Sequence, residues 1–542
     1  MNNLMKYQLL LDKITETSPI LTDEAKIELK AKSDDFIKDV QDLQYIKVPL
    51  VGVFSAGKSS LLNIFTQKAG MLPVDTMPET AVAYELYYGQ TECVELYRNG
   101  NKIDSKPLAE IKQLNTNPGD IAKVYCTSEP IKALQERGII LVDMPGIGSG
   151  IERHDAAIFN YISTGTAFVL IVDAEQGSLR GSTLAFMNEL SQYNMHPAVL
   201  VSKIDKKPEA DVKDIVDYIR YQMTKLGDND PFIGTVCSVN NNLEGFKQYL
   251  EELNPETLVA EKLNKQLRLI INSVVSQIKT RIDVRTNDIS NIEEKIKKVD
   301  EEIANVKAEL PTGNSEINSP EKSTQDILGN VYAALESKAT DIAQMIIDRE
   351  DSEEIKAVIV STVRTEIISS LQTESEQYST ALGAAVKESV QNMPKIEIDN
   401  NFMNDFSGIL DMVNQYVGKL LLLGGIWAKL ASILLPHLPK ILNWLFGKSD
   451  EEVLEEAREK FMSKCVGQII EGIKPAVYKI IVDNQKRIQE KLQAELVAKM
   501  EAVKSGLREK IADANKTKDD VEAEIARLNA AITHLNTVAA EI

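Results

Sequence analysis

One eight-residue run limits the fold of this chain more than any other feature. Gly52 to Ser59 reads G-V-F-S-A-G-K-S, with an apolar run at 48–51 before it and a helix-like run at 60–65 after it. A strand that turns through glycines into a helix N-terminus aims backbone N–H groups and the positive end of the helix dipole at one anion. The pattern therefore predicts an α/β domain in which this loop binds phosphate.

Each residue type in the loop has a physical use. Lys58 adds a mobile positive charge for phosphate oxygens, and the Ser59 hydroxyl is placed to ligate Mg²⁺. The residues expected to surround the phosphates through their backbone or side chains are Gly52, Ser55, Ala56, Gly57, Lys58, Ser59 and Ser60. The loop thus predicts a nucleotide with a bound metal ion.

A second motif follows the apolar run 138–142, which is typical of a strand buried on both faces of a parallel sheet. Asp143 ends this run and begins the sequence D-M-P-G. We expect the Asp143 carboxylate to act on Mg²⁺ through water, and the Gly146 backbone N–H to meet the γ-phosphate. Contact with the γ-phosphate would let this loop sense hydrolysis.

A third motif, S-K-I-D at 202–205, follows the apolar run 198–201. An aspartate in this position accepts two hydrogen bonds from the N1–H and N2 amine of guanine, a pair that adenine does not offer. Asp205 is therefore the expected base-reading residue, with Lys203 beside it. Three such motifs in this order, each after a buried strand, predict a guanine-nucleotide-binding domain.

With these motifs the chain resembles the dynamin superfamily of GTPases, and within it the bacterial dynamin-like proteins. The segments that carry the resemblance are 54–63, 72–81 and 143–146, and it covers about residues 46–255. It implies GTP or GDP with Mg²⁺ as ligands. It also implies that Thr80 closes on Mg²⁺ and the attacking water, that Ser55 helps to compensate charge, and that Ser238 lies in the weaker base-edge motif. The catalytic set is then Ser55, Lys58, Thr80 and Gly146, and the metal set is Ser59, Thr80 and Asp143.

Two departures from the family pattern bear on turnover. Ile147 stands where small Ras-like GTPases place a water-orienting glutamine, and Phe54 stands where better-known dynamins carry a polar residue. Neither Arg153 nor Arg180 is predicted to be an arginine finger. These features leave open a nucleotide-dependent assembly scaffold that hardly hydrolyses GTP. An ATP-driven helical motor is disfavoured by Asp205.

Composition narrows the partners and the compartment. The chain has 542 residues and a net charge of −20, which argues against nucleic acid because binding a phosphate backbone takes clustered Lys and Arg. Its four cysteines show no CxxC or zinc-ligand spacing, and the N-terminus has too short an apolar run for an export signal. We expect a cytoplasmic protein that contacts membranes peripherally.

After about residue 255 the pattern becomes helical. Apolar residues three and four apart run from Ile289 to Leu310 and again from Val521 to Leu535, and Pro475 predicts a kink in a long helix. The expected fold is an α/β P-loop GTPase domain plus a long all-α stalk of neck and trunk with a hydrophobic tip. Its expected divisions are N-terminal helices packing with the neck at 1–45, the GTPase domain at 46–255, neck helices and a hinge at 256–322, outgoing stalk helices at 323–415, the tip at 416–447, and returning helices at 448–542. A compact helical bundle without a mechanical role is the alternative.

The predicted tip, 416–447, has an unusual composition for this acidic chain. Between Asp411 and Asp450 there is no acidic residue, the only full charges are four lysines, and both tryptophans of the chain lie here. Apolar surface, interfacial aromatics and positive charge are typical of a segment that inserts into a headgroup layer, and the lysines interrupt it too often for a spanning helix. A buried bundle tip or a self-association surface remains the alternative.

These features together predict a dynamin-like GTPase that binds and slowly hydrolyses GTP. We expect it to couple this cycle to membrane binding, remodelling or vesicle formation. The expected partners are membrane lipid through 416–447, a second copy in a homo-oligomer or GTPase-domain dimer, and a related dynamin-like protein.

Overall fold

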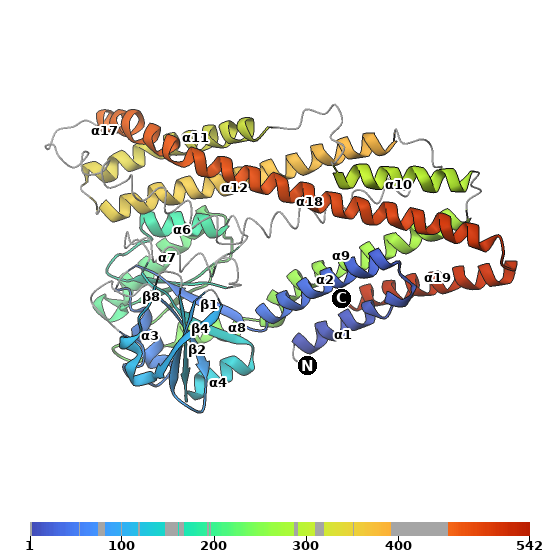
Figure 1. Ribbon diagram of the computed structural model, residues 1–542. Helices are drawn as coiled ribbons and strands as arrows, with labels where there is room; N and C mark the ends of the chain where they lie inside the picture. The colour runs from blue at the N-terminus through green and yellow to red at the C-terminus, as the bar shows by residue number, and fades with distance from the viewer. Residues whose placement is uncertain are drawn as a thin grey trace.

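The computed structural model describes residues 3–53, 55–73, 82–98, 100–117, 120–146, 161, 167–191, 195, 197–286, 291–308, 319–348, 350, 352–391 and 454–542. These residues form a sheet domain and a set of long helices, which confirms the predicted fold class (Figure 1). The predicted tip, Thr80, Phe54, Ile147 and Arg153 lie outside the described residues.

The sheet domain is built on a nine-stranded sheet in the order β4-β3-β5-β2-β6-β1-β7-β8-β9. The strands are β1 (Ile46–Val51), β2 (Ala83–Tyr88), β3 (Cys93–Arg98), β4 (Asn101–Pro107), β5 (Ile121–Cys126), β6 (Ile139–Asp143), β7 (Val169–Asp173), β8 (Ala198–Ser202) and β9 (Ile233–Thr235). From β6 to β9 all neighbours are parallel, whereas β2 runs antiparallel to β6 and β3 antiparallel to both β4 and β5. Because β6, β1, β7 and β8 are parallel, their carboxyl ends meet at one edge of the sheet.

The residues on β6, β7 and β8 are buried along their whole length, as the continuous apolar runs of the sequence predict. Helices connect and cover these strands: α3 (Lys58–Phe65), α4 (Glu129–Glu136), α6 (Gly181–Ser191), α7 (Glu209–Lys225) and α8 (Glu244–Glu252). Short 3-10 helices lie at Leu108–Gln113 and Ile204–Lys206. The sequence did not predict the extension made by β2 to β5, in which β3 and β5 alternate buried and half-buried residues and β4 has no buried residue.

The neck is formed by helices from both ends of the chain. α1 (Asn3–Thr15) and α2 (Asp23–Asp42) pack against α9 (Pro255–Thr286), as do α19 (Lys518–Glu541) and part of α18 (Gly467–Asp513). A 3-10 turn at Ser18–Ile20 joins α1 to α2. The two chain ends therefore lie close together in the neck (Figure 1).

Helix starts follow ordinary capping chemistry. The Thr22 hydroxyl accepts a hydrogen bond from the Ala25 N–H at the start of α2, and the Thr517 hydroxyl accepts one from the Asp520 N–H at the start of α19. Ser319 does the same for the Lys322 N–H at the start of α11 (Pro320–Ile347). Each such cap stabilises its helix by about 1 kcal/mol, because it satisfies a backbone donor that the helix itself cannot.

The trunk consists of α11, α12 (Ser352–Gln391), α17 (Leu454–Lys460), a π-helical turn at Phe461–Val466 and the first part of α18, with α10 (Ile292–Ala308) packed on α18. The α10 seam buries Val299, Ile303 and Val306, in line with the predicted spacing. Helix α18 continues through Pro475 without a break in its helical assignment. At roughly 1.5 Å per residue this helix spans about 70 Å.

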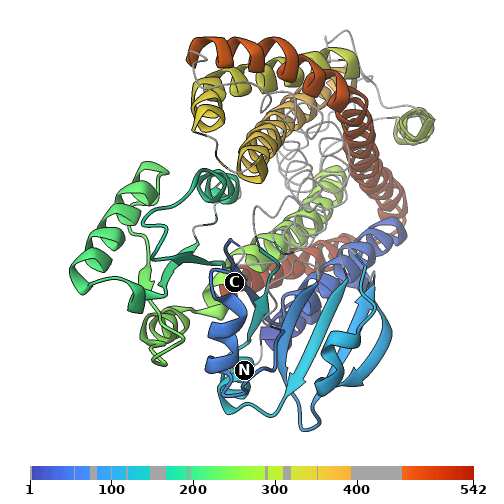
Figure 2. The same cartoon turned by 90° about the vertical axis from the view of Figure 1, so that its left-hand side faces the viewer.

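The trunk lies alongside the sheet domain and contacts it (Figures 1 and 2). Helix α12 packs on α6, and a side chain added at Gly181 would come within 3.2 Å of the Val358 Cγ2. Buried apolar side chains continue from the sheet domain into the trunk as one cluster. The two parts therefore share a core in this conformation.

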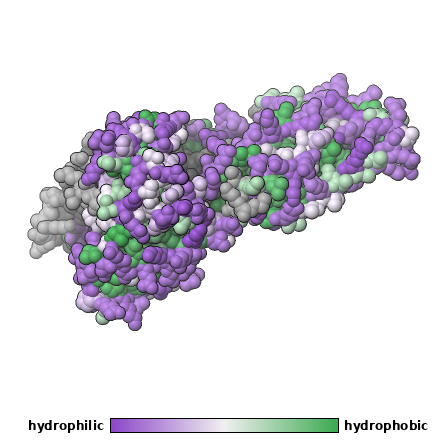
Figure 3. All heavy atoms as spheres, turned by 90° about the horizontal axis from the view of Figure 1, so that it is seen from below, coloured by the Kyte–Doolittle hydropathy of each residue, from purple (hydrophilic) through white to green (hydrophobic). Residues whose placement is uncertain are grey.

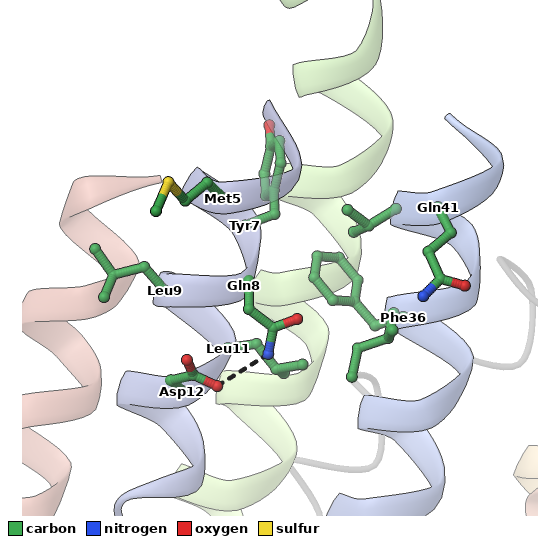
Figure 4. A pocket seen from close by; sticks show the side chains of 10 residues that line it. Met5, Tyr7, Gln8, Leu9, Leu11, Asp12, Phe36 and Gln41 are labelled. Carbon is green, nitrogen blue, oxygen red and sulfur yellow. Dashed lines mark hydrogen bonds between the residues drawn. The ribbon is translucent and has the colours of Figure 1, made fainter. Parts of the chain in front are cut away.

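The surface seen in Figure 3 is mainly hydrophilic with scattered apolar residues, in keeping with the strongly acidic composition. One apolar groove of about 520 Å³ lies between α1 and α2, beside Met5 and Leu9, which are 65% and 48% exposed (Figure 4). This groove belongs to the neck and includes none of the nucleotide-site residues predicted above. No helix among the described residues is both long and apolar enough to cross a membrane.

A buried ion cluster ties α9 to α18 and α19. The Arg285 side chain is 2% exposed and pairs with Asp513 at 2.8 Å, Glu524 at 2.9 Å and Glu509 at 3.3 Å. We expect Arg285→Met to lower the free energy of unfolding by about 3 kcal/mol, because it removes the nearer cation from the largely buried Asp513 carboxylate and leaves Lys516, at 3.4 Å, as its ion-pair partner. Urea unfolding followed by circular dichroism measures this loss.

The control for that experiment is Lys297→Met, which removes an exposed pair with Glu301 on α10. Exposed ion pairs contribute little to stability, so this variant should change the free energy of unfolding by less than about 0.5 kcal/mol. Equal effects of the two substitutions would contradict the structural role given to the Arg285 cluster.

Candidate nucleotide-binding site

The loop from Gly52 to Gly57 lies where β1 passes into α3. A side chain on Gly52 would meet the Ile171 backbone oxygen of β7 at 2.4 Å, so only glycine allows this approach. Gly57 precedes α3 with φ of 97°, a left-handed conformation that glycine adopts without strain. Ala56 is buried and Ser55 is exposed with φ of 64°. The local sequence thus folds the loop tightly against the sheet with its rim open.

Lys58 occupies the centre of the loop. Its side chain is largely buried, and its ammonium donates hydrogen bonds to the backbone oxygens of Gly52 at 3.0 Å and Val53 at 3.2 Å. Burial lowers the pKa of the Lys58 ammonium to about 8, and the charge of Asp143 opposes this shift. Among the described residues, the hydrogen bonds that this buried cation donates go to neutral carbonyl oxygens, so an anionic partner would bind it more strongly.

Asp143, at the end of β6, faces the first turn of α3. Its Oδ2 accepts a hydrogen bond from the Ser59 hydroxyl at 2.6 Å, while its buried Oδ1 forms no hydrogen bond with any described residue. Burial raises the pKa of the Asp143 carboxyl to about 6, against the opposing effects of Ser59 and Lys58. A hydroxyl and a carboxylate with a spare oxygen form a hard-oxygen donor set that fits Mg²⁺. Gly146, three residues on, is also buried.

The Ser202 hydroxyl, at the end of β8, connects the two ends of the site. It donates to the Ala56 backbone oxygen at 2.7 Å and lies 3.2 Å from the Val172 backbone oxygen. The start of the S-K-I-D motif therefore holds the phosphate loop in place. No role was predicted for Ser202 beyond opening the S-K-I-D motif, although its position at the end of a buried strand was a usable signal.

The predicted base end forms around Lys203 and Asp205. Lys203 adopts φ of 55° and pairs with Asp173 at 2.6 Å, and Asp205 Oδ1 accepts a hydrogen bond from the Cys237 thiol at 3.0 Å. Ser238 follows Cys237 directly and is half-buried. Asp173 was missed by sequence reasoning, though it ends the buried strand β7 as Asp143 ends β6.

The structure thus gathers most of the predicted residues at one edge of the sheet. Gly52, Ser55, Ala56, Gly57, Lys58, Ser59, Ser60, Asp143 and Gly146 lie at the ends of β1 and β6, and Lys203, Asp205 and Ser238 lie after β8 and β9. Thr80 falls outside the described residues, and its predicted role stays a prediction. The arrangement defines the class of protein: a P-loop nucleotide-binding domain joined to a long helical neck and trunk.

Residues 48–205 match the model described as Dynamin family. This match confirms the predicted resemblance of the nucleotide-binding domain to the dynamin family.

Other similarities are more distant. The chain is 12% and 13% identical to two chains from structures described as an oligomerised bacterial dynamin pair, covering 95% and 99% of this chain and 91% and 98% of theirs, each with a TM-score of 0.34. Era from Aquifex aeolicus bound to GDP and AlF4⁻ is 15% identical over 45% of this chain and 68% of its own, with a TM-score of 0.24. An uncharacterized protein from the xynA 3′ region of Caldicellulosiruptor sp. is 23% identical over 297 residues, 52% of this chain and 72% of that protein.

The raised pKa of Asp143 has a consequence for stability. The pKa of Asp143 in the folded protein, about 6, lies above its ordinary value of 3.8, so the folded state holds this proton more tightly than the unfolded state does. The stability that comes from this proton is fully present below about pH 4 and is lost as the pH rises through 6. We expect Asp143→Asn to stabilise the nucleotide-free protein above pH 6 by about 1–3 kcal/mol, because the amide removes a buried charge and still accepts from Ser59. Urea unfolding across pH 4–8 measures the difference, which should grow between pH 4 and 6 and then level. A variant less stable than the wild type at pH 7 would contradict this.

Proposed function

We propose that this protein binds GTP with Mg²⁺ at the carboxyl edge of its sheet, hydrolyses GTP slowly, and couples that cycle to membrane binding. The observation that supports this most is the Ser59–Asp143 pair beside Lys58. A buried carboxylate with an unbonded oxygen is costly by itself, and it is accounted for if a cation and a phosphate chain bind there.

At the phosphate end, Lys58 would exchange its two backbone oxygens for oxygens of the β- and γ-phosphates. The N–H groups at the start of α3 would donate to the same phosphates, aided by the helix dipole. Ser59 would hold Mg²⁺ directly, and Asp143 would hold it through water. When bound, Mg²⁺ supplies neutralisation of charge on the β- and γ-phosphates. We assign Gly146 to contact the γ-phosphate through its backbone.

At the base end, Asp205 would accept hydrogen bonds from N1–H and N2 of guanine. The Cys237 thiol at 3.0 Å supports the Asp205 carboxylate, and the Lys203 stem offers an apolar surface beside it. Ser238 would lie near the base edge. Rejection of adenine follows because adenine offers the Asp205 carboxylate no pair of donors to match the N1–H and N2 amine of guanine.

Hydrolysis requires a positioned water. With Ile147 in place of a glutamine, we assign this task to Thr80 and to the loop around Ser55. Ile147 in this position also supports a second function, a scaffold that binds GTP and assembles with very slow turnover. GTP turnover measured with and without liposomes separates the two.

The membrane part of the proposal is supported by the composition of 416–447. We assign this segment to lipid contact, and we expect the protein to act as a homo-oligomer or through paired nucleotide-binding domains, with a related dynamin-like partner as a further expectation. The lysines interrupt the apolar runs of this segment too often for a spanning helix, which supports a peripheral attachment. Remodelling or vesicle formation would follow from nucleotide-driven movement of the trunk.

For the nucleotide site, we expect Lys58→Ala to weaken GTP binding at least a hundredfold, because no other described loop residue carries a positive charge. Isothermal titration calorimetry with GTP and Mg²⁺ measures this. Lys68→Ala is the matched control. Lys68 lies ten positions after Lys58 and pairs with Glu92 away from the loop, so the GTP affinity of this variant should be unchanged. Wild-type affinity in Lys58→Ala would refute the assignment.

For the membrane segment, we expect Leu434→Asp combined with Trp444→Asp to abolish co-sedimentation with anionic liposomes. Buried apolar side chains contribute roughly 1.5–3 kcal/mol each and lysines near anionic lipid about 1 kcal/mol each, so insertion should dominate and salt should weaken wild-type binding only partly. The control replaces Leu9 and Ile27, two exposed apolar neck residues, with aspartate. Binding that tolerates the first pair but disappears in salt would show that charge alone holds the lipid.

A further inference from the structure

Two ion pairs join the loop after β7 to the loop after β8. Asp173 pairs with Lys203, and further along the two loops, by two and three residues respectively, Glu175 pairs with Lys206. The side chains of the inner pair are 11% and 30% exposed, and those of the outer pair are 51% and 44% exposed. The inner pair therefore lies in a drier environment, where an ion pair is stronger and its loss more costly.

Asp173 is itself held rigidly. Its Oδ2 receives the Lys203 ammonium at 2.6 Å, and its Oδ1 accepts a hydrogen bond from the Glu175 N–H at 2.9 Å. The Gln176 N–H donates to the Asp173 backbone oxygen at 2.9 Å, which closes a turn around the residue. Both carboxylate oxygens are thus engaged, and the acceptor offered to Lys203 has a fixed position.

Lys203 is fixed at its other end by the backbone. Its φ of 55° and ψ of 36° are left-handed, a conformation unusual for a residue with a side chain. It lies between Ser202, which holds the phosphate loop, and Asp205, which is proposed to read the base. With the backbone and the ammonium both held, the four-carbon stem of Lys203 keeps one direction.

Asp205 lies within electrostatic range of this cluster. The pKa of Lys206 is raised first by its hydrogen bond to Glu175, and the charges of Asp173 and Asp205 add to that shift. Asp205 also lies only two residues after Lys203, in the 3-10 turn Ile204–Lys206, so a lysine released from Asp173 has a second carboxylate nearby along the chain. Pairing between Lys203 and Asp205 would occupy the oxygens that guanine needs.

We propose that Asp173 is a positioning residue for base selection: by holding the Lys203 ammonium, it keeps the lysine stem along one face of the purine and leaves Asp205 free to bind guanine. This inference rests on the proposed function, because it takes the nucleotide to be GTP. Asp173 contacts no nucleotide itself and acts through Lys203.

The competing interpretation is that Asp173 only ties two loops together. Base selectivity separates the two, because a structural tie would weaken all nucleotides alike. We expect Asp173→Asn to weaken GTP binding about tenfold while ATP binding changes less than twofold, so the GTP-to-ATP preference falls. Glu175→Gln is the matched control, since it removes the outer pair of the same two loops, and both affinities should stay within twofold.

A double-mutant cycle with Lys203→Met tests the route of action, because methionine keeps an apolar stem without the charge. If Asp173 acts through the ammonium, Asp173→Asn should have no effect on selectivity in the Lys203→Met background. Competition binding of GTP and ATP to the full chain, with a thermal unfolding scan of each variant, measures all arms. Equal loss for GTP and ATP, unchanged selectivity, or the same effect in both backgrounds overturns the proposal.

The wild-type arm separates this proposal from the function on which it rests. A wild type that prefers GTP, together with an Asp173→Asn variant of unchanged preference, overturns only the role of Asp173. A wild type that binds GTP and ATP equally overturns the guanine assignment and the role of Asp173 together.

Discussion

The hydrogen bond from the Ser59 hydroxyl to Asp143 is the interaction on which the rest of this molecule depends. It joins the first turn of α3 to the end of β6, and the other Asp143 carboxylate oxygen is buried with no hydrogen-bond partner among the residues that the structure describes, with Lys58 as the compensating charge. Such a buried charged group destabilises the fold unless a bound ligand compensates its charge. Gly52 pressed against β7 and Ser202 bonded to Ala56 hold the surrounding loop so that this arrangement persists.

The same edge of the sheet also faces the trunk. The segment from Asp173 to Gly181 begins at the Lys203 pair and ends where α6 meets α12. Between these points the Leu179 N–H and carbonyl both bond to the Gln222 side chain, at 3.0 and 3.2 Å. The base end of the site and the trunk are thus connected by nine residues fixed at several points, a short physical route between nucleotide and helices.

Much of the fold was predictable because its signals are local. The loop at Gly52–Ser59 and the buried strands before Asp143 and Asp205 can each be recognised from about ten residues of sequence. The order of these motifs along the chain implies a parallel sheet. The helical periodicity of α10 and α19 was equally local. The extension β2 to β5 was missed because its half-buried strands, such as β3 with Glu95 and Tyr97, alternate apolar and polar residues without a chemical motif.

By itself the sequence determined which residues carry charge, hydroxyl or glycine beside each strand, and hence the prediction of a phosphate loop, a metal-binding aspartate and a base-reading aspartate. Only the tertiary structure decided which distant groups meet. The pairing of Asp173 with Lys203, the bond from Ser202 to Ala56 and the packing of α12 on α6 all join residues 30 or more positions apart. Such contacts depend on strand order and on how long helices fold back, which packing over the whole chain settles.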